Sequence, residues 1–94
     1  MNFGDALQML KQGQRVARFG WNGKGMWLAL SPGCKNLPAD VFWSGPIREF
    51  ANSVGGTCTV LPNIMMKTAD VEPSVVPWLA SQTDILAEDW MVVG

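Results

Sequence analysis

The most chemically suggestive stretch of the sequence is a run of small hydrogen-bonding side chains between two tryptophans. Trp78 and Trp90 bracket this run, which consists of Ser81, Gln82, Thr83 and Asp84. Large flat rings beside several donors and acceptors are what binding of a nucleobase or a sugar requires. The same residues also fit a structural corner, because Ser81 and Asp84 have capping-box spacing and both rings are suited to a core. The capping-box spacing and the size of the two rings, taken alone, favour a structural role for this stretch over a role in ligand binding.

A second group of candidates lies in residues 20–25, which read Gly-Trp-Asn-Gly-Lys-Gly. The pair Asn22 and Gly23 is a strong signal for a tight hairpin turn. Because such a turn does not need an aromatic residue before it, Trp21 is either a lid over the core or a stacking surface. Lys24 is the nearest cation, and the glycines would let a ligand approach the backbone closely. Their spacing matches neither a phosphate-binding loop nor a dinucleotide fingerprint.

The composition argues against several classes of function. Histidine is absent, which removes the usual general base near neutral pH and the commonest metal ligand. Cys34 and Cys58 lack the spacing of a zinc site, so free thiols in a cytosolic protein are expected. A net charge of −1 with seven scattered Lys and Arg argues against long nucleic acids as partners, whereas a small anion needs only one or two cations. No apolar run is long enough to span a membrane, and the first residues do not form a signal peptide.

The elements that must position these groups can be predicted from the spacing of apolar residues. Phe3, Ala6, Leu7 and Leu10 share one helical face, and Gly13 supplies a stop, which predicts an N-terminal helix. Strands are predicted over residues 14–19, 26–30, 59–67, 74–79 and 90–93. The strand over 26–30 is continuously apolar and is expected to be buried on both faces. One turn of helix is expected between the last two strands.

Residues 31–58 are the least regular part and are predicted to be an insertion between two strands of the sheet. A short helix is suggested over 37–43, and a better one begins at Pro46, with apolar residues repeating at Ile47, Phe50, Ala51 and Val54. The sum is one α+β domain over residues 1–94, in which an N-terminal helix packs on an antiparallel sheet of about five strands, with a helical insertion in the middle. An apolar excess, 48% hydrophobic against 16% charged residues, points to further burial between subunits.

Four phrases of the sequence together resemble one family. They are Gly20–Met26 (GWNGKGM), Met66–Asp70 (MKTAD), Pro77–Asp84 (PWLASQTD) and Ala87–Trp90 (AEDW). With these phrases in place, the chain resembles the second Thoeris anti-defence family of phages, which consists of small proteins that sequester immune signalling nucleotides. The resemblance covers about two-thirds of the chain, namely residues 3–13, 15–30 and 62–93.

The resemblance implies a binding protein rather than an enzyme, with no cofactor, no metal and no catalytic residue. Relatives bind cyclic ADP-ribose isomers made by TIR-domain enzymes, the glycocyclic ones in particular, and release them intact. Some also hold cyclic oligonucleotides made by cGAS-like enzymes of CBASS defence, at a separate site. The implied assembly is a homotetramer, a dimer of dimers, with ligand sites at subunit interfaces, and the implied location is the cytoplasm of the infected bacterial host.

The resemblance also suggests a role for each candidate residue. Trp21 or Trp27 would stack on adenine, and Lys24 would offset the pyrophosphate charge. Asp84 would accept a hydrogen bond from a ribose diol or an adenine amino group. The other candidate ligand contacts are Asn22, Trp78, Ser81, Gln82 and Thr83, although Trp78, like Trp90, is also suited to the core.

Two other functions stay open at this point. An enzyme that degrades the same signals would need a positioned base, a nucleophile or a metal, and no histidine or paired carboxylate motif supplies one. A protein–protein inhibitor of a bacterial defence enzyme would use exposed aromatic residues as binding hot spots.

Overall fold

The computed structural model describes residues 1–94. Backbone contacts divide the chain into two compact units. The sheet unit comprises Met1–Ser31 and Asn63–Gly94, and the insertion unit comprises Pro32–Pro62. None of the helices combines the length and the apolar character that crossing a membrane requires.

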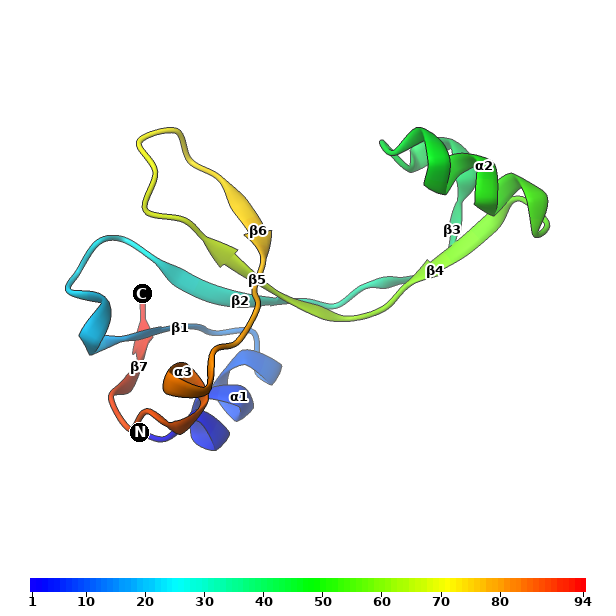
Figure 1. Ribbon diagram of the computed structural model, residues 1–94. Helices are drawn as coiled ribbons and strands as arrows, with labels where there is room; N and C mark the ends of the chain where they lie inside the picture. The colour runs from blue at the N-terminus through cyan, green and yellow to red at the C-terminus, as the bar shows by residue number, and fades with distance from the viewer. The chain divides into compact units, whose positions relative to one another are not determined.

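The sheet unit contains a five-stranded antiparallel sheet and two α-helices (Figure 1). The strands follow the order β6-β5-β2-β1-β7 across the sheet. In chain order the elements are α1 (Phe3–Lys11), β1 (Arg15–Arg18), the 3-10 turn η1 (Phe19–Trp21), β2 (Trp27–Ser31), β5 (Asn63–Lys67), β6 (Val75–Pro77), α3 (Gln82–Leu86) and β7 (Trp90–Val93). The predicted α+β class, with an N-terminal helix on an antiparallel sheet, is confirmed.

Local sequence explains where α1 begins and ends. The side chain of Asn2 accepts a hydrogen bond from the backbone N–H of Asp5 at 2.8 Å, which caps the first turn. The Asp5 carboxylate in the first turn and the Lys11 ammonium in the last turn both complement the helix dipole. The chain then leaves the helix through Gly13, whose φ of +86° suits a residue without a Cβ.

The strand register places the even-numbered residues of the five strands on one face of the sheet and the odd-numbered residues on the other. Val16 pairs with Leu28 and with Val92, and Leu28 pairs with Met66. Because successive side chains alternate across a strand, all even-numbered strand residues share one face and all odd-numbered ones share the other. We call these the even face and the odd face of the sheet.

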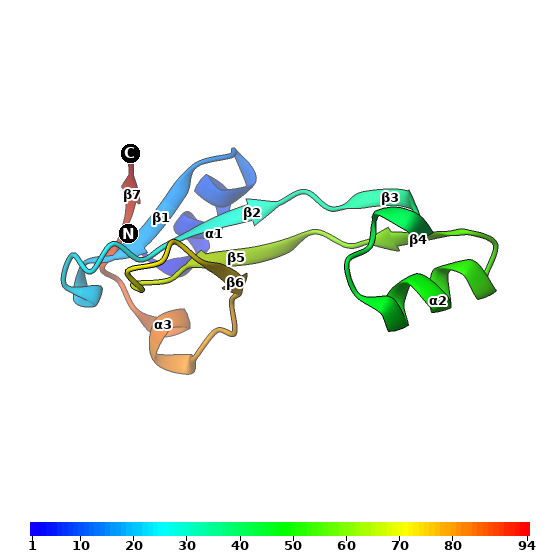
Figure 2. The ribbon, with the colours of Figure 1, turned by 90° about the horizontal axis from the view of Figure 1, so that it is seen from above.

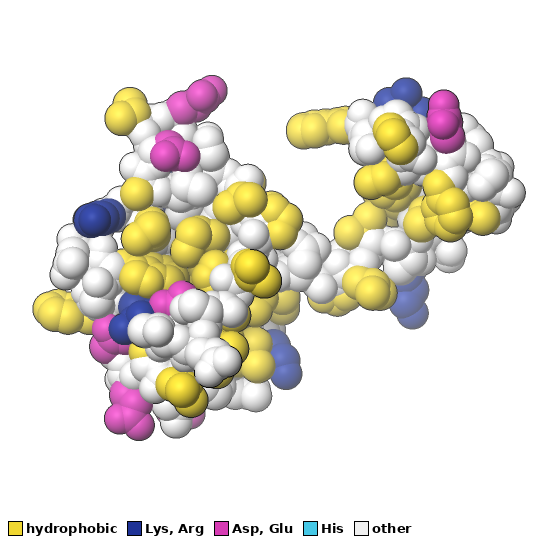
Figure 3. Space-filling view, in the orientation of Figure 1, with side chains coloured by type: hydrophobic (Ala, Val, Ile, Leu, Met, Phe, Trp, Pro, Cys, Tyr) yellow, Lys and Arg dark blue, Asp and Glu magenta, His cyan; other side chains and the backbone are white.

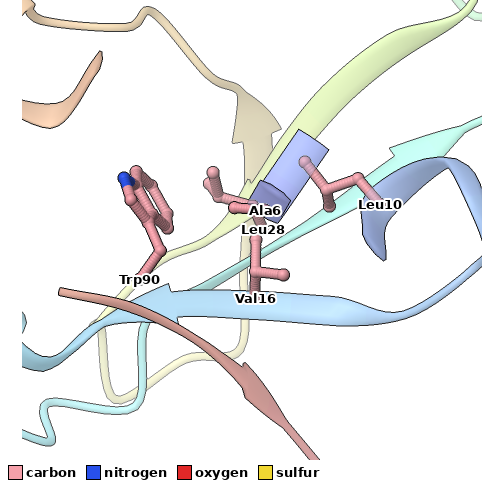
Figure 4. Packing of buried hydrophobic residues seen from close by; sticks show 5 residues of the cluster. All are labelled: Ala6, Leu10, Val16, Leu28 and Trp90. Atoms are coloured by element: carbon pink, nitrogen blue, oxygen red, sulfur yellow. The ribbon is translucent and has the colours of Figure 1, made fainter. Parts of the chain in front are cut away.

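The even face packs against α1 to form the core of the sheet unit (Figure 4). Leu10, Val16 and Leu28 are fully buried, and Trp90 is nearly so. α3 is held on the same face, because the backbone carbonyl of Asp84 accepts a hydrogen bond from the indole N–H of Trp90 at 2.9 Å. Both helices therefore cover one side of the sheet.

The odd face carries no helix and is largely apolar. Its residues include Ala17, Trp27, Ala29, Met65 and Met91. The prediction that residues 26–30 would be buried on both faces is wrong, because within β2 only Leu28 is buried, whereas Trp27 and Ala29 are half-buried. Several apolar side chains of this face are therefore at least partly exposed to solvent.

The insertion unit contains a two-stranded antiparallel sheet and one helix (Figure 2). Its elements are β3 (Cys34–Pro38), the 3-10 turn η2 (Ala39–Val41), α2 (Gly45–Ser53) and β4 (Thr57–Val60). The helix that the sequence predicts from Pro46 is confirmed. Cys34 and Cys58 are free thiols.

Two predicted elements of this region are wrong. The strand predicted over 59–67 is interrupted at Leu61 and Pro62, so it forms β4 and β5 in two different sheets, because proline has no N–H to donate to a ladder. The helix suggested over 37–43 is a strand up to Pro38 followed by a single 3-10 turn.

The packing of the even face predicts that Leu28→Ala lowers the free energy of unfolding by about 2–5 kcal/mol, because the truncated side chain leaves a cavity in a closed core. The matched control is Leu79→Ala, since Leu79 is 93% exposed, and its effect should stay within about 0.5 kcal/mol. Urea unfolding followed by circular dichroism measures both. Equal effects of the two substitutions would contradict the assigned core.

Candidate functional site

A pocket of about 200 Å³ lies on the odd side of the sheet unit, where the chain connects β1 to β2. Its lining combines two tryptophans, two methionines, one lysine, one arginine and several small residues. The lining residues are Ala17, Arg18, Trp21, Gly23, Lys24, Gly25, Met26, Trp27, Met91, Val93 and Gly94. Three of the candidates from the sequence, Trp21, Lys24 and Trp27, are therefore brought together in one cavity.

The connection between β1 and β2 shapes one wall of this pocket. η1 places Trp21, and the next two residues, Asn22 and Gly23, are both left-handed, with φ of +59° and +64°. The backbone N–H of Lys24 donates to the carbonyl of Trp21 at 3.4 Å across this turn. The tight turn expected at Asn22 and Gly23 is thus present, and Asn22 is an exposed residue of the turn rather than part of the pocket lining.

The two pocket tryptophans are held in place by different partners. The Trp21 ring meets the Trp90 ring edge-on, with centroids 5.4 Å apart and an interplanar angle of 78°. The guanidinium carbon of Arg15 lies 5.0 Å from the centroid of the Trp27 ring, a cation–π contact that covers one face of that ring. Because both rings are packed on a neighbour, they form pre-organised walls that a flat ligand could contact without first ordering the side chains.

Three cations border the pocket without a carboxylate partner. Lys24 lines it, Arg15 lies over Trp27, and the ammonium of Lys67 lies beside Gly25, only 3.4 Å from where a Cβ on that glycine would stand. Both ion pairs of the structure belong to Arg18 instead. The pocket is therefore an aromatic cavity with uncompensated positive charge, which suits a flat anionic ligand.

Arg18, which also lines the pocket, forms a cluster of charges with two carboxylates. Its Nη1 contacts Oδ1 of Asp84 at 2.7 Å, and its Nε contacts Oδ1 of Asp89 at 2.8 Å. Oδ2 of Asp89 also accepts a hydrogen bond from the backbone N–H of Gly20 at 2.7 Å. The cluster joins β1, η1, α3 and the segment that leads into β7, which fixes the position of the pocket wall.

These contacts shift two pKa values. The hydrogen bond from Arg18 lowers the pKa of Asp89 below its usual range, and the Gly20 N–H acts in the same direction. The hydrogen bonds to Asp89 and then Asp84 raise the pKa of Arg18. Both groups are therefore held in their charged forms, as a structural ion pair needs.

The remaining candidates lie on the helix side of the sheet and do not line the pocket. Ser81 caps α3, because its hydroxyl accepts a hydrogen bond from the N–H of Asp84 at 3.1 Å. Trp78 packs in the aromatic cluster, 5.7 Å from Phe3 and 6.1 Å from Trp90 between ring centroids. Gln82 and Thr83 are exposed in the first turn of α3. Their assignment as ligand contacts stays a prediction.

Sequence reasoning missed Arg15, Arg18 and Lys67, which the pairing of distant strands brings to the pocket and its supports. For Arg15 and Arg18 a signal was present, because the two arginines flank the adjacent apolar residues Val16 and Ala17. For Lys67 no local signal exists, since its place next to Gly25 depends on the pairing of Lys67 with Trp27. No group of three or more His, Cys, Asp or Glu side chains that could hold a metal ion is found.

Comparison with known proteins gives two matches. The family model described as the Thoeris anti-defense 2-like domain matches residues 1–93. The chain is also 45% identical over 95 residues to the protein named Thoeris anti-defense 2 of Bacillus phage SP01, and the match covers 100% of this chain and 96% of that relative. Both findings confirm the resemblance recognised in the four sequence phrases.

The Arg18 cluster predicts how stability depends on pH. Because the pKa of Asp89 is lower in the folded chain than in the unfolded one, its carboxylate contributes stability that is fully present above about pH 4 and is lost as the pH falls through the folded-state pKa. The Asp89→Asn variant should therefore lose less stability than the parent between about pH 4 and pH 2. Urea midpoints measured across this range test the prediction.

The Arg18→Gln variant is the matched control, because it removes the cause of the shift while keeping the carboxylate. The pKa of Asp89 should then lie closer to its value in the unfolded chain, so this variant should also lose less stability than the parent between about pH 4 and pH 2. An Asp89→Asn variant that follows the parent's pH dependence would show that this ion pair does not contribute to stability.

Proposed function

The chain belongs to the Thoeris anti-defense 2-like family of phage anti-defence proteins, and we propose that it acts by binding a small cyclic nucleotide immune signal and sequestering it intact. The ligand that we propose is glycocyclic ADP-ribose made by TIR-domain enzymes. The proposed place of action is the cytoplasm of the infected host, where such a signal would be produced.

The observation that carries this proposal is the pocket in which two tryptophans meet unpaired cations. Trp21 and Trp27 offer aromatic surface for a base, and stacking of a base on an aromatic ring contributes about 1–3 kcal/mol in other proteins. Lys24 and Lys67 lie where the phosphates of a stacked nucleotide could be neutralised. Glycocyclic ADP-ribose carries both features, because it has an adenine base and a negatively charged pyrophosphate.

The size of the pocket supports a site shared between copies of the chain. A volume of about 200 Å³ exceeds the roughly 150 Å³ of a cavity that admits benzene, so one ring system can enter. It is below the roughly 300–1,000 Å³ of typical small-molecule sites. We propose that one chain provides half of the site and that a second copy covers the odd face and encloses the rest of the ligand, within a homotetramer built as a dimer of dimers.

Binding without turnover is supported by the state of the nearest carboxylates. A carboxylic acid that donates a proton at neutral pH needs a raised pKa, usually through burial or a nearby negative charge. Asp84 and Asp89 instead share one guanidinium, and the pKa of Asp89 is lowered. They are suited to holding the fold together rather than to cleaving a glycosidic or phosphate bond.

The proposal predicts that Trp27→Ala weakens binding of glycocyclic ADP-ribose by roughly 5- to 150-fold, which corresponds to about 1–3 kcal/mol of lost stacking. Isothermal titration calorimetry of the purified protein, with no other protein present, measures this. Trp43→Ala is the control, since Trp43 belongs to the insertion unit and is 98% exposed. Unchanged binding by the Trp27 variant would contradict the assigned pocket, and no binding by the parent would contradict the function.

The same site predicts a specific dependence on salt. Lys67→Gln should weaken binding and make the dissociation constant less sensitive to salt concentration, because one uncompensated cation is removed from the pocket rim. Lys11→Gln, in the last turn of α1, should leave both quantities unchanged. Titrations at low and high salt compare the two variants. A parallel salt dependence in parent and Lys67 variant would show that Lys67 does not face the ligand.

A further inference from the structure

The turn between β1 and β2 contains an asparagine followed by a glycine, and the two groups that could react with each other there are both unpaired. Asn22 and Gly23 are exposed. The side-chain amide of Asn22 makes no hydrogen bond, and the backbone N–H of Gly23 makes none either. The turn lies at the outer edge of the sheet unit, where the surface is mainly uncharged with a basic side chain beside it (Figure 3).

An asparagine and the amide of the residue after it can form a cyclic succinimide. The deprotonated backbone nitrogen of Gly23 attacks Cγ of Asn22, so a C–N bond forms, and the bond from Cγ to the side-chain nitrogen breaks with release of ammonia. Water then opens the ring. Opening at the side-chain carbonyl gives aspartate, and opening at the main-chain carbonyl gives isoaspartate, in which the backbone runs through the side-chain carbon. Water is the one co-reactant.

A second asparagine shows what the glycine contributes. Asn22 and Asn36 are the two residues other than glycine with a left-handed backbone, with φ of +59° and +54°, and both are exposed. Leu37 follows Asn36, and its Cβ hinders the approach of its nitrogen to Cγ, whereas Gly23 has no Cβ. Asn36 is also held in β3, where its N–H donates to the hydroxyl of Thr59 at 3.2 Å. The reaction should therefore select Asn22.

The turn has to open before the ring can close, because a left-handed asparagine does not bring the next nitrogen to its Cγ. The contact across the turn is weak, since the N–H of Lys24 lies 3.4 Å from the carbonyl of Trp21, whereas such bonds usually measure about 2.7–3.2 Å. The N–H of Asn22 donates to the carbonyl of Phe19 at 3.0 Å, and this bond can persist while the following peptide rotates. Exposed turns of this kind open locally at low cost.

We propose that Asn22 and Gly23 form a site of spontaneous deamidation, and that the product weakens binding of an anion in the adjacent pocket. The second part rests on the proposed function. Gly23 and Lys24 line the pocket, so the new carboxylate arises next to one lining residue and two positions from the lysine that it would partly neutralise. Isoaspartate also adds a methylene to the main chain before Gly23, which displaces the lining.

Peptide mapping of the parent protein after warm incubation at mildly alkaline pH tests the site. Trypsin releases Asn22 in the peptide Phe19–Lys24 and Asn36 in the peptide Asn36–Arg48, so mass spectrometry reads each asparagine separately. Relative to protein digested without incubation, aspartate and isoaspartate should accumulate in the first peptide and not in the second. No change in the first peptide, or an equal change in both, would overturn the proposed site.

Calorimetric titration with glycocyclic ADP-ribose before and after the incubation tests the effect on the pocket. The affinity of fully modified parent should fall by roughly 5-fold, the effect of one carboxylate at close range to a charge in water. The matched control is Asn22→Gly, because glycine accepts the left-handed φ and has no amide to lose. Whatever its starting affinity, this variant should keep it through the incubation.

Two results would overturn the proposed effect on binding. They are an unchanged affinity of the modified parent and an equal fall in the Asn22→Gly variant. Absence of binding by fresh parent protein would instead contradict the proposed function, and the peptide map would still decide whether Asn22 is modified.

Discussion

The rest of the sheet unit depends on the contacts that the indole ring of Trp90 makes. Its ring centroid lies 5.3 Å from Phe3, 5.4 Å from Trp21 and 6.1 Å from Trp78, so segments far apart in the sequence meet on one side chain. Its N–H, which burial would otherwise leave unpaired, donates to the carbonyl of Asp84. Because Trp21 is both a neighbour of this ring and a wall of the pocket, the pocket takes its shape from the core.

The two faces of the sheet differ in how they are covered and in how their charges are paired. The even face is closed by α1 and α3, and there the charge of Arg18 is balanced by two carboxylates. The odd face is apolar but uncovered, and the cations around its pocket, Arg15, Lys24 and Lys67, are not balanced by any ion pair. If the chain binds the ligand that we propose, stability and affinity would rest largely on different charges, and substitutions of Arg15, Lys24 or Lys67 would leave the Arg18 ion pairs in place.

The parts of the fold that follow from local chemistry were predictable from the sequence, and the parts set by strand pairing were not. Asn2 and Gly13 mark the ends of α1, and Ser81 caps α3, because these residues act on the backbone within a few positions of themselves. The break at Pro62 could be expected as an edge or a bulge, but its assignment of β4 and β5 to different sheets depends on distant partners. For the same reason the sequence could not separate the Ser81–Asp84 segment from Trp21, nor bring Lys67 beside Gly25.

The most direct test of sequestration is native mass spectrometry of the protein after mixing with the product of a TIR-domain enzyme, followed by heating and identification of the released small molecule. If the protein binds the signal without degrading it, the complex carries the mass of the cyclic nucleotide and returns that molecule chemically unchanged. Recovery of a linear or hydrolysed product would contradict the central claim, and would direct attention to Asp84 and Asp89 as reacting groups.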